Sequence, residues 1–496
     1  MFRSILIANR GEIAVRVIRA CRELGIESIA VYSDADDRAL HVALADRAVR
    51  IGPAPAAQSY LSGEAILQAA RETGAEAIHP GYGFLAESHA FAASCAGAGL
   101  AFIGPPSGVI ARMGSKTAAR ALAEQAGVPV VPGATPSDQR DETIAAAACR
   151  LGFPVVVKPS EGGGGIGMKT VPEEASLLPA IAQARREAAA AFGDGTLYVE
   201  RLIDRPRHVE IQVVGDHHGR IVHLFERECS LQRRHQKIVE EAPSPAVTPA
   251  LRARMGGAAV ALARAAGYRN CGTVEFLLDG SGDEARFYFL EMNTRLQVEH
   301  PVTEQTTGVD LVRTQIVVAA GGPLPWTQDE LRQRGHAIEV RVYAEDPERH
   351  DLPQAGPLLL YREPSMPGVR VDGGVAEGGD VSVHYDPLVA KLIAWGDTRD
   401  LARRRALAAL RSYPILGVRT NGPFLIALLE HPRFIAGQLD TGLVEAERPV
   451  LLAGLAGAPP PEAVAVARHA SVDAAAHDPN GPAVIDPWTL LRGWRG

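Results

Sequence analysis

The spacing of apolar positions predicts a parallel sheet in the first part of the chain. Apolar runs at 3–9, 27–33 and 76–82 have strand character, and segment 11–25 has the apolar period of a helix. Short strands that alternate with helices of about 10–15 residues are typical of βαβ units. We therefore expect a Rossmann-like block over residues 1–112. The turn after its first strand lacks the fingerprint GxGxxG, so we predict no dinucleotide site there.

The middle of the chain has the pattern of antiparallel strands. The runs 196–204, 207–216 and 221–231 have strand character, and the segment GDHHG forms a turn between the last two. A third block, residues 334–445, continues with strand-like runs and a helical segment. The last residues, 446–496, are rich in Ala and Pro, and we interpret them as a linker-like tail.

A glycine-rich segment lies between two further strand-like runs. Gly162 to Gly165 are consecutive glycines, and Gly167 follows them. The backbone N–H groups of such a loop can surround phosphate oxygens without obstruction by side chains. Lys158 lies just before the loop and Lys169 just after it. We interpret the segment as a phosphate-binding loop, with a plain linker as the alternative.

A second hairpin carries acidic groups. Glu275 and Glu291 lie on two apolar runs, and the segment DGSGDEA between them has the composition of a turn. A turn near Gly282 would place the two glutamates opposite each other. Strand alternation would put Glu291 and Asn293 on one face. The other face would carry Tyr288, Leu290 and Met292. Two carboxylates and an amide oxygen suit Mg²⁺, whereas the alternative is a solvated hairpin face.

Composition and charge narrow the class of protein. The 496 residues are 46% hydrophobic and 22% charged, which is ordinary for a soluble chain of about three domains. A net charge of -7 argues against nucleic-acid binding, and no apolar run is long enough to span a membrane. The five cysteines lack CxxC spacing, and the amino terminus lacks a secretory signal. We therefore expect a protein of the reducing cytoplasm.

Lysine is rare in this chain. The 51 basic residues include only five lysines, which are Lys116, Lys158, Lys169, Lys237 and Lys391. A lysine in such a chain is expected where a compact charge with three rotatable donors is needed. Glycine N–H donors, isolated lysines and a carboxylate pair for metal are together the groups that transfer the γ-phosphoryl of ATP. The Walker sequence is absent, so this is not a P-loop enzyme.

Several segments resemble the biotin carboxylases, which are ATP-grasp enzymes, in the same order and at tight spacing. They are HPGYGFLAES (79–88), MGSK (113–116), VVVKPSEGGGGIGM (155–168), RHVEIQ (207–212), QRRHQKIVEEAPSP (232–245), EMNTRLQVEHPVTE (291–304), EVRVYAEDP (339–347) and DPLVAKLI (386–393). The resemblance implies a fold of class α/β and α+β, with a Rossmann-like amino-terminal domain (1–112) and an ATP-grasp domain (113–333). A lid over about 130–203 and a carboxy-terminal biotin carboxylase domain (334–445) complete it.

The resemblance also implies the chemistry. Biotin carboxylases use MgATP to phosphorylate bicarbonate, and the carboxyphosphate delivers CO₂ to biotin held on a carrier protein. Here Lys237 would reach the γ-phosphate and bicarbonate, and Glu299 would remove the bicarbonate proton. Arg341 would stabilise the biotin enolate. Bicarbonate itself would be bound by Arg295, Gln297 and Val298, since a guanidinium fork suits a planar anion.

The remaining site residues follow from the same resemblance. Two Mg²⁺ or Mn²⁺ ions would be held by Glu275, Glu291 and Asn293. ATP would be bound by Lys116, Lys158, Gly163, Gly164, Gly165, Glu200, Ile203, His208, Gln232 and His235. One position departs from the family pattern, because Ile166 stands in the glycine loop where an Arg is usual. Weaker ATP binding follows, and a non-catalytic nucleotide-binding subunit remains an alternative.

The expected assembly is an acetyl-CoA or acyl-CoA carboxylase of the kind used in fatty acid biosynthesis. Expected partners are a biotin carboxyl carrier protein and carboxyltransferase subunits, and the chain would be a homodimer. Alternatives are a split α chain of a methylcrotonyl- or propionyl-type carboxylase and another ATP-grasp ligase that joins a carboxylate to an amine. The only Met-Lys pair, Met168-Lys169, precedes Thr170 and not Met, so we expect biotin on a partner and not on this chain.

Overall fold

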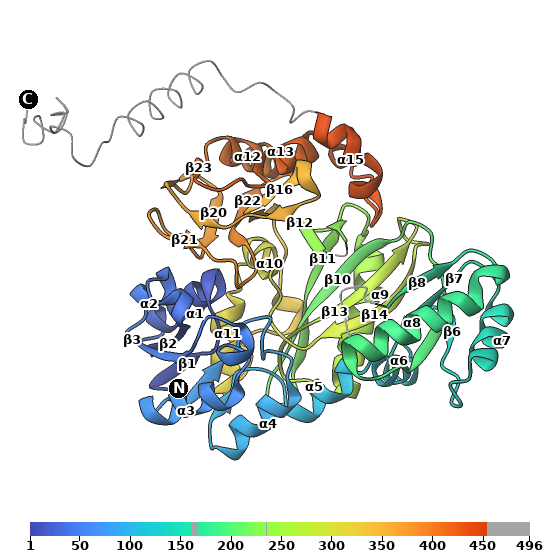
Figure 1. Cartoon of the computed structure of the whole chain (residues 1–496), viewed down its shortest axis with the longest axis horizontal. Helices are drawn as coiled ribbons and strands as arrows, with labels where there is room; N and C mark the ends of the chain where they lie inside the picture. The colour runs from blue at the N-terminus through green and yellow to red at the C-terminus, as the bar shows by residue number, and fades with distance from the viewer. Residues whose placement is uncertain (161–166, 235, 454–496) are drawn as a thin grey trace, which may run out of the picture.

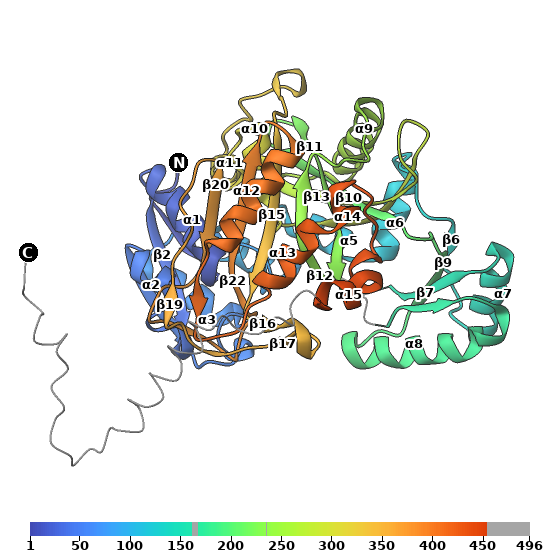
Figure 2. The same cartoon turned by 90° about the horizontal axis from the view of Figure 1, so that it is seen from above.

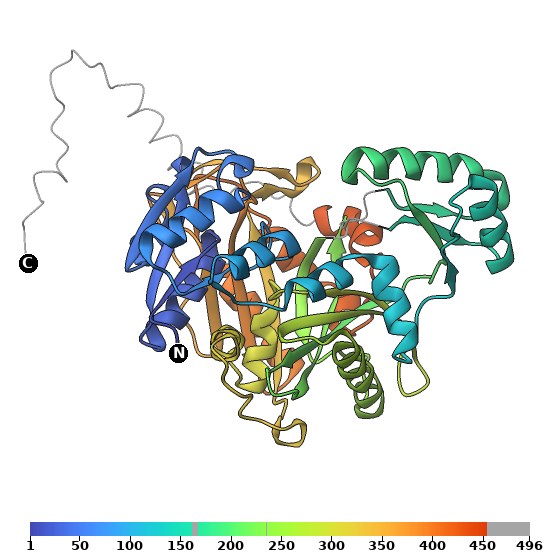
Figure 3. The same cartoon turned by 90° about the horizontal axis from the view of Figure 1, so that it is seen from below.

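The computed structural model describes residues 1–160, 167–234 and 236–453 of the chain. The amino-terminal and carboxy-terminal parts lie next to each other on one side of the molecule, with the central strands beside them (Figure 1). The described part of segment 133–201 projects to the opposite side. Figures 2 and 3 show the same projection from above and from below.

The amino-terminal part is built on a five-stranded sheet in which every strand pair is parallel, as predicted. Its order is β3-β2-β1-β4-β5. The strands are β1 (Ser4–Ile7), β2 (Glu27–Ser33), β3 (Arg47–Gly52), β4 (Ala77–His79) and β5 (Ala101–Phe102), and helices α1 (Gly11–Glu23), α2 (Leu40–Leu44), α3 (Gly63–Thr73) and α4 (His89–Gly97) connect them. Strand β3 was not predicted, because half of its residues are exposed at the sheet edge and the strand lacks an apolar run.

The projecting segment is a small sheet covered by two helices. It comprises β6 (Gly133–Ala134), β7 (Val155–Pro159), β8 (Lys169–Val171) and β9 (Leu197–Arg201), with α7 (Asp141–Leu151) and α8 (Leu177–Phe192). Buried aliphatic side chains such as Ile144, Val157 and Ile181 form its own core. Strands β7 and β8 pair in antiparallel fashion. The expected phosphate loop therefore joins two hairpin strands, although residues 161–166 lie outside the described residues.

An eight-stranded antiparallel sheet runs through the rest of the molecule. Its order is β14-β13-β10-β11-β12-β15-β22-β20. The strands are β10 (Arg207–Gly215), β11 (Ile221–Arg233), β12 (Gln236–Ala242), β13 (Asn270–Asp279), β14 (Arg286–Asn293), β15 (His336–Tyr343), β20 (Val369–Gly373) and β22 (Leu388–Gly396). Because β12 pairs with β15, the blocks expected at 113–333 and 334–445 share one sheet.

Helices pack on this sheet and carry clear end signals. Helix α9 (Pro249–Ala266) lies against β10 and β11. The Thr248 side chain accepts a hydrogen bond from the Leu251 N–H, and Gly267 ends the helix in the left-handed conformation. The other helices are α5 (Ser107–Gly114), α6 (Lys116–Gln125), α10 (His300–Thr307), α11 (Leu311–Ala319), α12 (Arg399–Arg411), α13 (Gly422–Glu430), α14 (Pro432–Ile435) and α15 (Leu443–Ala453).

Two details differ from the sequence predictions. Helix α15 continues to Ala453, and Leu451 is buried in the carboxy-terminal core, so residues 446–453 are helical and not a linker. The predicted alternation along β14 holds for Glu291, Met292 and Asn293 but is wrong for Leu290, where a bulge interrupts it. Met292 packs in the core with Phe289, whereas Leu290 lines the same cavity as Glu291. Within the described residues, no helix is both long and apolar enough to cross a membrane.

Candidate active site

A cavity of about 880 Å³ lies between the projecting segment and the large sheet. Every candidate site residue that the structure describes contributes to its lining. These are Lys116, Lys158, Glu200, Ile203, His208, Gln232, Lys237, Glu275, Glu291, Asn293, Arg295, Gln297, Val298, Glu299 and Arg341. The candidates Gly163, Gly164, Gly165 and His235, and the departure at Ile166, lie outside the described residues.

One wall of the cavity comes from the projecting segment. Lys158 on β7 donates a hydrogen bond of 2.6 Å to Glu200 Oε2 on the neighbouring β9. Arg120 on α6 donates to the other oxygen, Oε1, at 2.8 Å. Arg120 was missed by the sequence analysis, although its spacing of four residues from Lys116 places both cations on one face of the helix. Lys158 and Arg120 together hold Glu200 in place, and Lys158 gives this wall a positive charge.

The acidic hairpin has the expected register. Glu275 pairs directly with Glu291 across β13 and β14. Burial raises the pKa of Glu291, and the Glu275 carboxylate raises it further. Lys116 opposes this shift, with its Nζ 3.7 Å from Glu291 Oε2. Asn293 Nδ2 donates to Glu275 Oε1 at 2.8 Å, and its amide oxygen accepts a long hydrogen bond of 3.4 Å from Arg295 Nη2, which a metal ion would replace. A divalent cation fits this donor set because it would neutralise two facing carboxylates.

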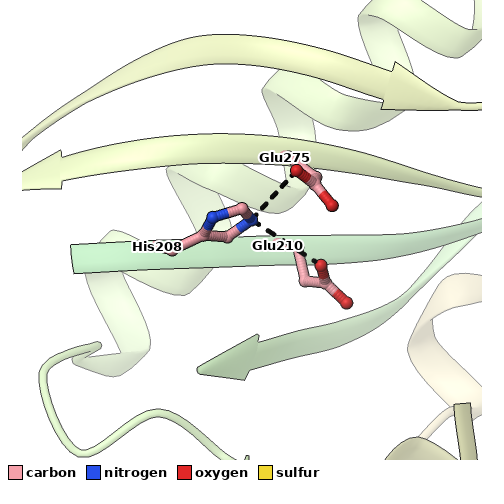
Figure 4. Close-up of side chains that lie close together, drawn as sticks. All are labelled: His208, Glu210 and Glu275. Carbon is pink, nitrogen blue, oxygen red and sulfur yellow. Dashed lines mark ion pairs between the residues drawn. The ribbon is translucent and has the colours of Figure 1, made fainter. Parts of the chain in front are cut away.

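A histidine lies between two carboxylates beside this hairpin (Figure 4). His208 Nε2 is 3.0 Å from Glu275 Oε2 and 3.9 Å from Glu210 Oε2. Burial lowers the pKa of His208, but the Glu275 carboxylate outweighs it, and the net direction is upward. The Glu275 carboxylate therefore favours the protonated form of His208. Glu210 was not predicted, although it lies two residues after His208 on β10 and so shares its face.

Lys237 is the centre of the charge network. Its ammonium donates to Glu210 Oε2 at 2.6 Å, Glu275 Oε1 at 2.8 Å and Glu299 Oε1 at 2.6 Å. Burial alone would lower the pKa of Lys237, but the three carboxylates hold it well above its usual value. The fully buried Arg227 donates to Glu210 from the other side. The Lys237 ammonium at the cavity floor is thus surrounded by three carboxyl groups.

Glu299 lies between two cations. Lys237 contacts its Oε1, and Arg341 Nη2 donates to its Oε2 at 3.0 Å. Burial alone would raise the pKa of Glu299, but Lys237 and then Arg341 hold it far below its usual range. Arg341 is itself fixed by Glu240, whose Oε1 accepts from Nε at 2.6 Å. Glu299 is therefore ionised and ready to accept a proton once a substrate displaces these contacts.

Arg295 connects the amino-terminal part to the cavity. Its Nε donates to Glu87 Oε2 at 2.8 Å, and its Nη1 donates to Gln297 Oε1 at 3.0 Å. Gln297 in turn donates to Glu275 Oε1 at 3.2 Å. Glu87 comes from the HPGYGFLAES segment after β4. The guanidinium is thus held at the cavity by polar groups from two parts of the chain.

Comparison with known proteins identifies this arrangement. The family model "Biotin carboxylase, N-terminal domain" matches residues 1–110, and "Biotin carboxylase C-terminal domain" matches residues 339–446. Between them, "Carbamoyl-phosphate synthase L chain, ATP binding domain" matches residues 115–327. A biotin carboxylase of Halalkalibacterium halodurans is 51% identical over 444 residues, which are 90% of this chain and 97% of the relative. The chain belongs to the biotin carboxylase family. The resemblance inferred from the sequence motifs is confirmed.

Solved biotin carboxylases have the same fold. The biotin carboxylase domain dimer of the Hydrogenobacter thermophilus 2-oxoglutarate carboxylase, in complex with MgADP, ADP and bicarbonate, matches with a TM-score of 0.87 and 44% identity. The match covers 91% of this chain and 99% of that one. A Campylobacter jejuni biotin carboxylase with a β,γ-ATP ligand has a TM-score of 0.87 and 41% identity, over 90% of this chain and 99% of that one. The predicted ATP-grasp fold of class α/β and α+β is therefore confirmed.

Some relatives are longer than this chain. The α subunit of methylcrotonoyl-CoA carboxylase from Rattus norvegicus is 50% identical over 441 residues, which are 89% of this chain and 61% of the relative. The chain thus spans about three fifths of the length of such α subunits. A pyruvate carboxylase component of Methanothermobacter thermautotrophicus is 51% identical, over 90% of this chain and 90% of the relative.

Proposed function

We propose that this biotin carboxylase uses ATP and bicarbonate to carboxylate biotin on a carrier protein. The observation that carries the proposal is the convergence of Lys237, the Glu275–Glu291 pair and the Glu299–Arg341 pair on one cavity. These groups match the three needs of the reaction, which are charge for phosphates, oxygen ligands for metal, and a base beside an anion site.

For the nucleotide, we assign the phosphates to Lys116, Lys158 and the Gly163–Gly165 loop. Glu200 and the backbone at Ile203 would border the adenine. His208, Gln232 and His235 would complete the site. Glu275, Glu291 and Asn293 would hold Mg²⁺ or Mn²⁺, which neutralises phosphate charge when bound. The positions of Lys116 and Lys158 in the cavity lining support this placement.

For the carboxylation chemistry, we assign bicarbonate to Arg295, Gln297 and Val298. A bicarbonate oxygen would attack the γ-phosphorus, the bond to ADP would break, and Glu299 would take the bicarbonate proton. Lys237 would stabilise the charge on the transferred phosphoryl group. Carboxyphosphate would then break into CO₂ and inorganic phosphate, and the phosphate would take the proton of the ureido nitrogen. Arg341 would stabilise the enolate oxygen of biotin while that nitrogen attacks CO₂. The buried positions of Glu299 and Arg341 support these roles, because charge interactions are stronger away from water.

We further propose that the chain is the biotin carboxylase part of an acyl-CoA carboxylase. The match to methylcrotonoyl-CoA carboxylase α subunits favours this class. The match to the Methanothermobacter pyruvate carboxylase component supports a pyruvate carboxylase as a second candidate. The expected partners are a carrier protein that presents biotin in trans, carboxyltransferase subunits and a second copy of this chain. The five free cysteines support a reducing compartment such as the cytoplasm.

The deciding experiment measures ADP release by the purified chain in the presence of MgATP. We expect release that depends on bicarbonate and increases when free biotin is added. A chain that binds ATP but releases no ADP under these conditions would instead be the non-catalytic nucleotide-binding subunit.

A further inference from the structure

Lys391 is a charged residue to which the proposed reaction assigns no role. It is 0% exposed and lies on β22, directly opposite Arg341 of β15. Its Nζ donates a hydrogen bond of 2.7 Å to the backbone oxygen of Val298. Val298 immediately precedes Glu299 in the loop between β14 and α10. The ammonium thus contacts the segment that presents the base, and Lys391 itself is not among the residues that line the cavity.

The same ammonium is held from the amino-terminal part of the chain. Glu12 Oε1 on α1 is 3.2 Å from Lys391 Nζ, and Glu12 is also buried. Burial raises the pKa of Glu12 to about 7, although the attraction of the Lys391 ammonium opposes this shift. The other charged groups that face Lys391 are Glu339, Asp372 and Arg370. Lys391 therefore connects α1 to the loop before α10.

The loop needs such support because it has little regular structure. Strand β14 ends at Asn293, and α10 begins only at His300. Among the residues that the structure describes, no backbone N–H donates to the Val298 oxygen, and Lys391 supplies its hydrogen bond. A lysine suits the position because its compact ammonium can serve a carbonyl and a carboxylate at once.

We propose that Lys391, anchored by Glu12, is a positioning residue that holds the Arg295–Glu299 loop so that Glu299 meets its substrate in a fixed orientation. The inference rests on the proposed role of Glu299 as the base. Misplacement of a catalytic group by about 1 Å can cost on the order of 100-fold in rate. Loss of the Val298 contact should therefore reduce turnover without removing any group from the cavity.

The test compares Lys391→Met, Glu12→Gln and the double variant. Lys391→Met should lower bicarbonate-dependent kcat by about 10-fold to 100-fold and raise the KM for bicarbonate, with MgADP affinity within about twofold of wild type. The kcat of the double variant should be no lower than that of Lys391→Met, because Glu12 acts only through the Lys391 ammonium. The double variant also removes the Glu12 charge that Lys391→Met would leave without its partner, so it serves if Lys391→Met alone does not fold.

Amide hydrogen exchange gives a readout that does not depend on activity. Exchange of the segment 294–302 should become about 10-fold faster in Lys391→Met and in the double variant. Arg252→Met is the matched control, because it breaks a buried ion pair with Glu226 outside the cavity. This control should lower thermal stability without changing amide exchange of the segment 294–302. It should also leave the ratio of the KM for bicarbonate to the KM for ATP unchanged.

The outcomes separate the two hypotheses. Unchanged exchange of 294–302 in Lys391→Met, or kinetic effects no different from those of Arg252→Met, would overturn the positioning role. If the effects of Lys391→Met and Glu12→Gln on kcat were additive in the double variant, the anchoring of Lys391 by Glu12 would be overturned. A wild-type chain without bicarbonate-dependent ADP release would refute the proposed function, whereas the exchange measurement would still decide whether Lys391 holds the loop.

Discussion

At the scale of single residues, the site depends on charges that hold one another in place. Lys237 contacts three carboxylates, and Glu299 lies between Lys237 and Arg341. An acid held so far below its usual pKa is a weak base in the free enzyme. An anionic substrate that competes for Lys237 and Arg341 would raise its basicity, which couples proton removal to substrate binding.

Two isosteric substitutions separate the metal site from the base. Glu299→Gln should leave MgADP affinity within about twofold and lower bicarbonate-dependent ADP release by at least about 100-fold, because only the proton acceptor is lost. Glu291→Gln should weaken binding of the Mg²⁺ complex itself, because a metal ligand is lost. Calorimetric titration with MgADP and steady-state kinetics measure both effects. Equal loss of nucleotide affinity in the two variants would contradict this division of roles.

A third residue-scale prediction concerns Arg120, which only the structure revealed. Arg120→Met removes one of the two cations on Glu200 and should raise the KM for ATP about 10-fold, since a charge-assisted hydrogen bond contributes about 1.5 kcal/mol or more. The KM for bicarbonate should not change. Arg112→Met, at an exposed position of α5, is the control and should leave both constants unchanged.

At the scale of elements, strand β12 joins the middle of the chain to its carboxy-terminal part. It pairs with β15, and the Glu241 side chain accepts hydrogen bonds from His336 on β15 and Arg399 on α12. Burial alone would raise the pKa of Glu241, but His336 and Arg399 lower it to about 2. A single buried carboxylate therefore helps to fasten three elements together.

The direction of this pKa shift predicts a pH dependence of stability. The folded pKa of Glu241 lies below its ordinary value of 4.5, so its contribution of about 3 kcal/mol is present above about pH 4.5 and is lost as pH falls toward 2. Denaturant unfolding should show Glu241→Gln less stable than wild type at neutral pH, with a difference that shrinks as pH is lowered through about 4. Glu430→Gln, in an exposed pair with Arg411, should change stability little. A difference for Glu241→Gln that does not vary with pH would contradict the assignment.

At the scale of the whole molecule, the cavity lies where the projecting segment meets the large sheet. Lys158 and Glu200 come from the projecting segment, whereas Lys237, Glu275 and Glu291 come from the sheet. A nucleotide in this cavity would contact both the projecting segment and the large sheet, and it would stabilise their present arrangement. Stability of the molecule should therefore depend on nucleotide binding.

MgADP should protect the protein against unfolding. At a free concentration of about 100 times Kd, it should increase the free energy of unfolding by about 2.7 kcal/mol. Lys158→Met should lose most of this increase at the same concentration, while Mg²⁺ alone should have little effect. Thermal unfolding monitored at several MgADP concentrations measures the shift. A shift in Lys158→Met equal to that of wild type would place the nucleotide elsewhere.

The sequence alone determined features that depend on near neighbours in the chain. Strand and helix periods predicted the parallel amino-terminal sheet, and a turn near Gly282 was enough to place Glu275 opposite Glu291. Motifs in a fixed order predicted the family and the residues that converge on the cavity. The pairing of Glu275 with Glu291 was predictable because a hairpin turn brings its two strands together over a few residues.

Only the tertiary structure decided how distant charges are paired. Glu12 and Lys391 are far apart in the chain, and their contact exists because α1 packs against β20, the strand next to β22 in the sheet. The bulge at Leu290 likewise arises from the fit of β14 to the core and the cavity together. The bridging of Glu200 by Arg120 and Lys158 also needs α6 beside the projecting sheet. Such contacts depend on how whole elements pack, and local sequence patterns carry no information about that packing.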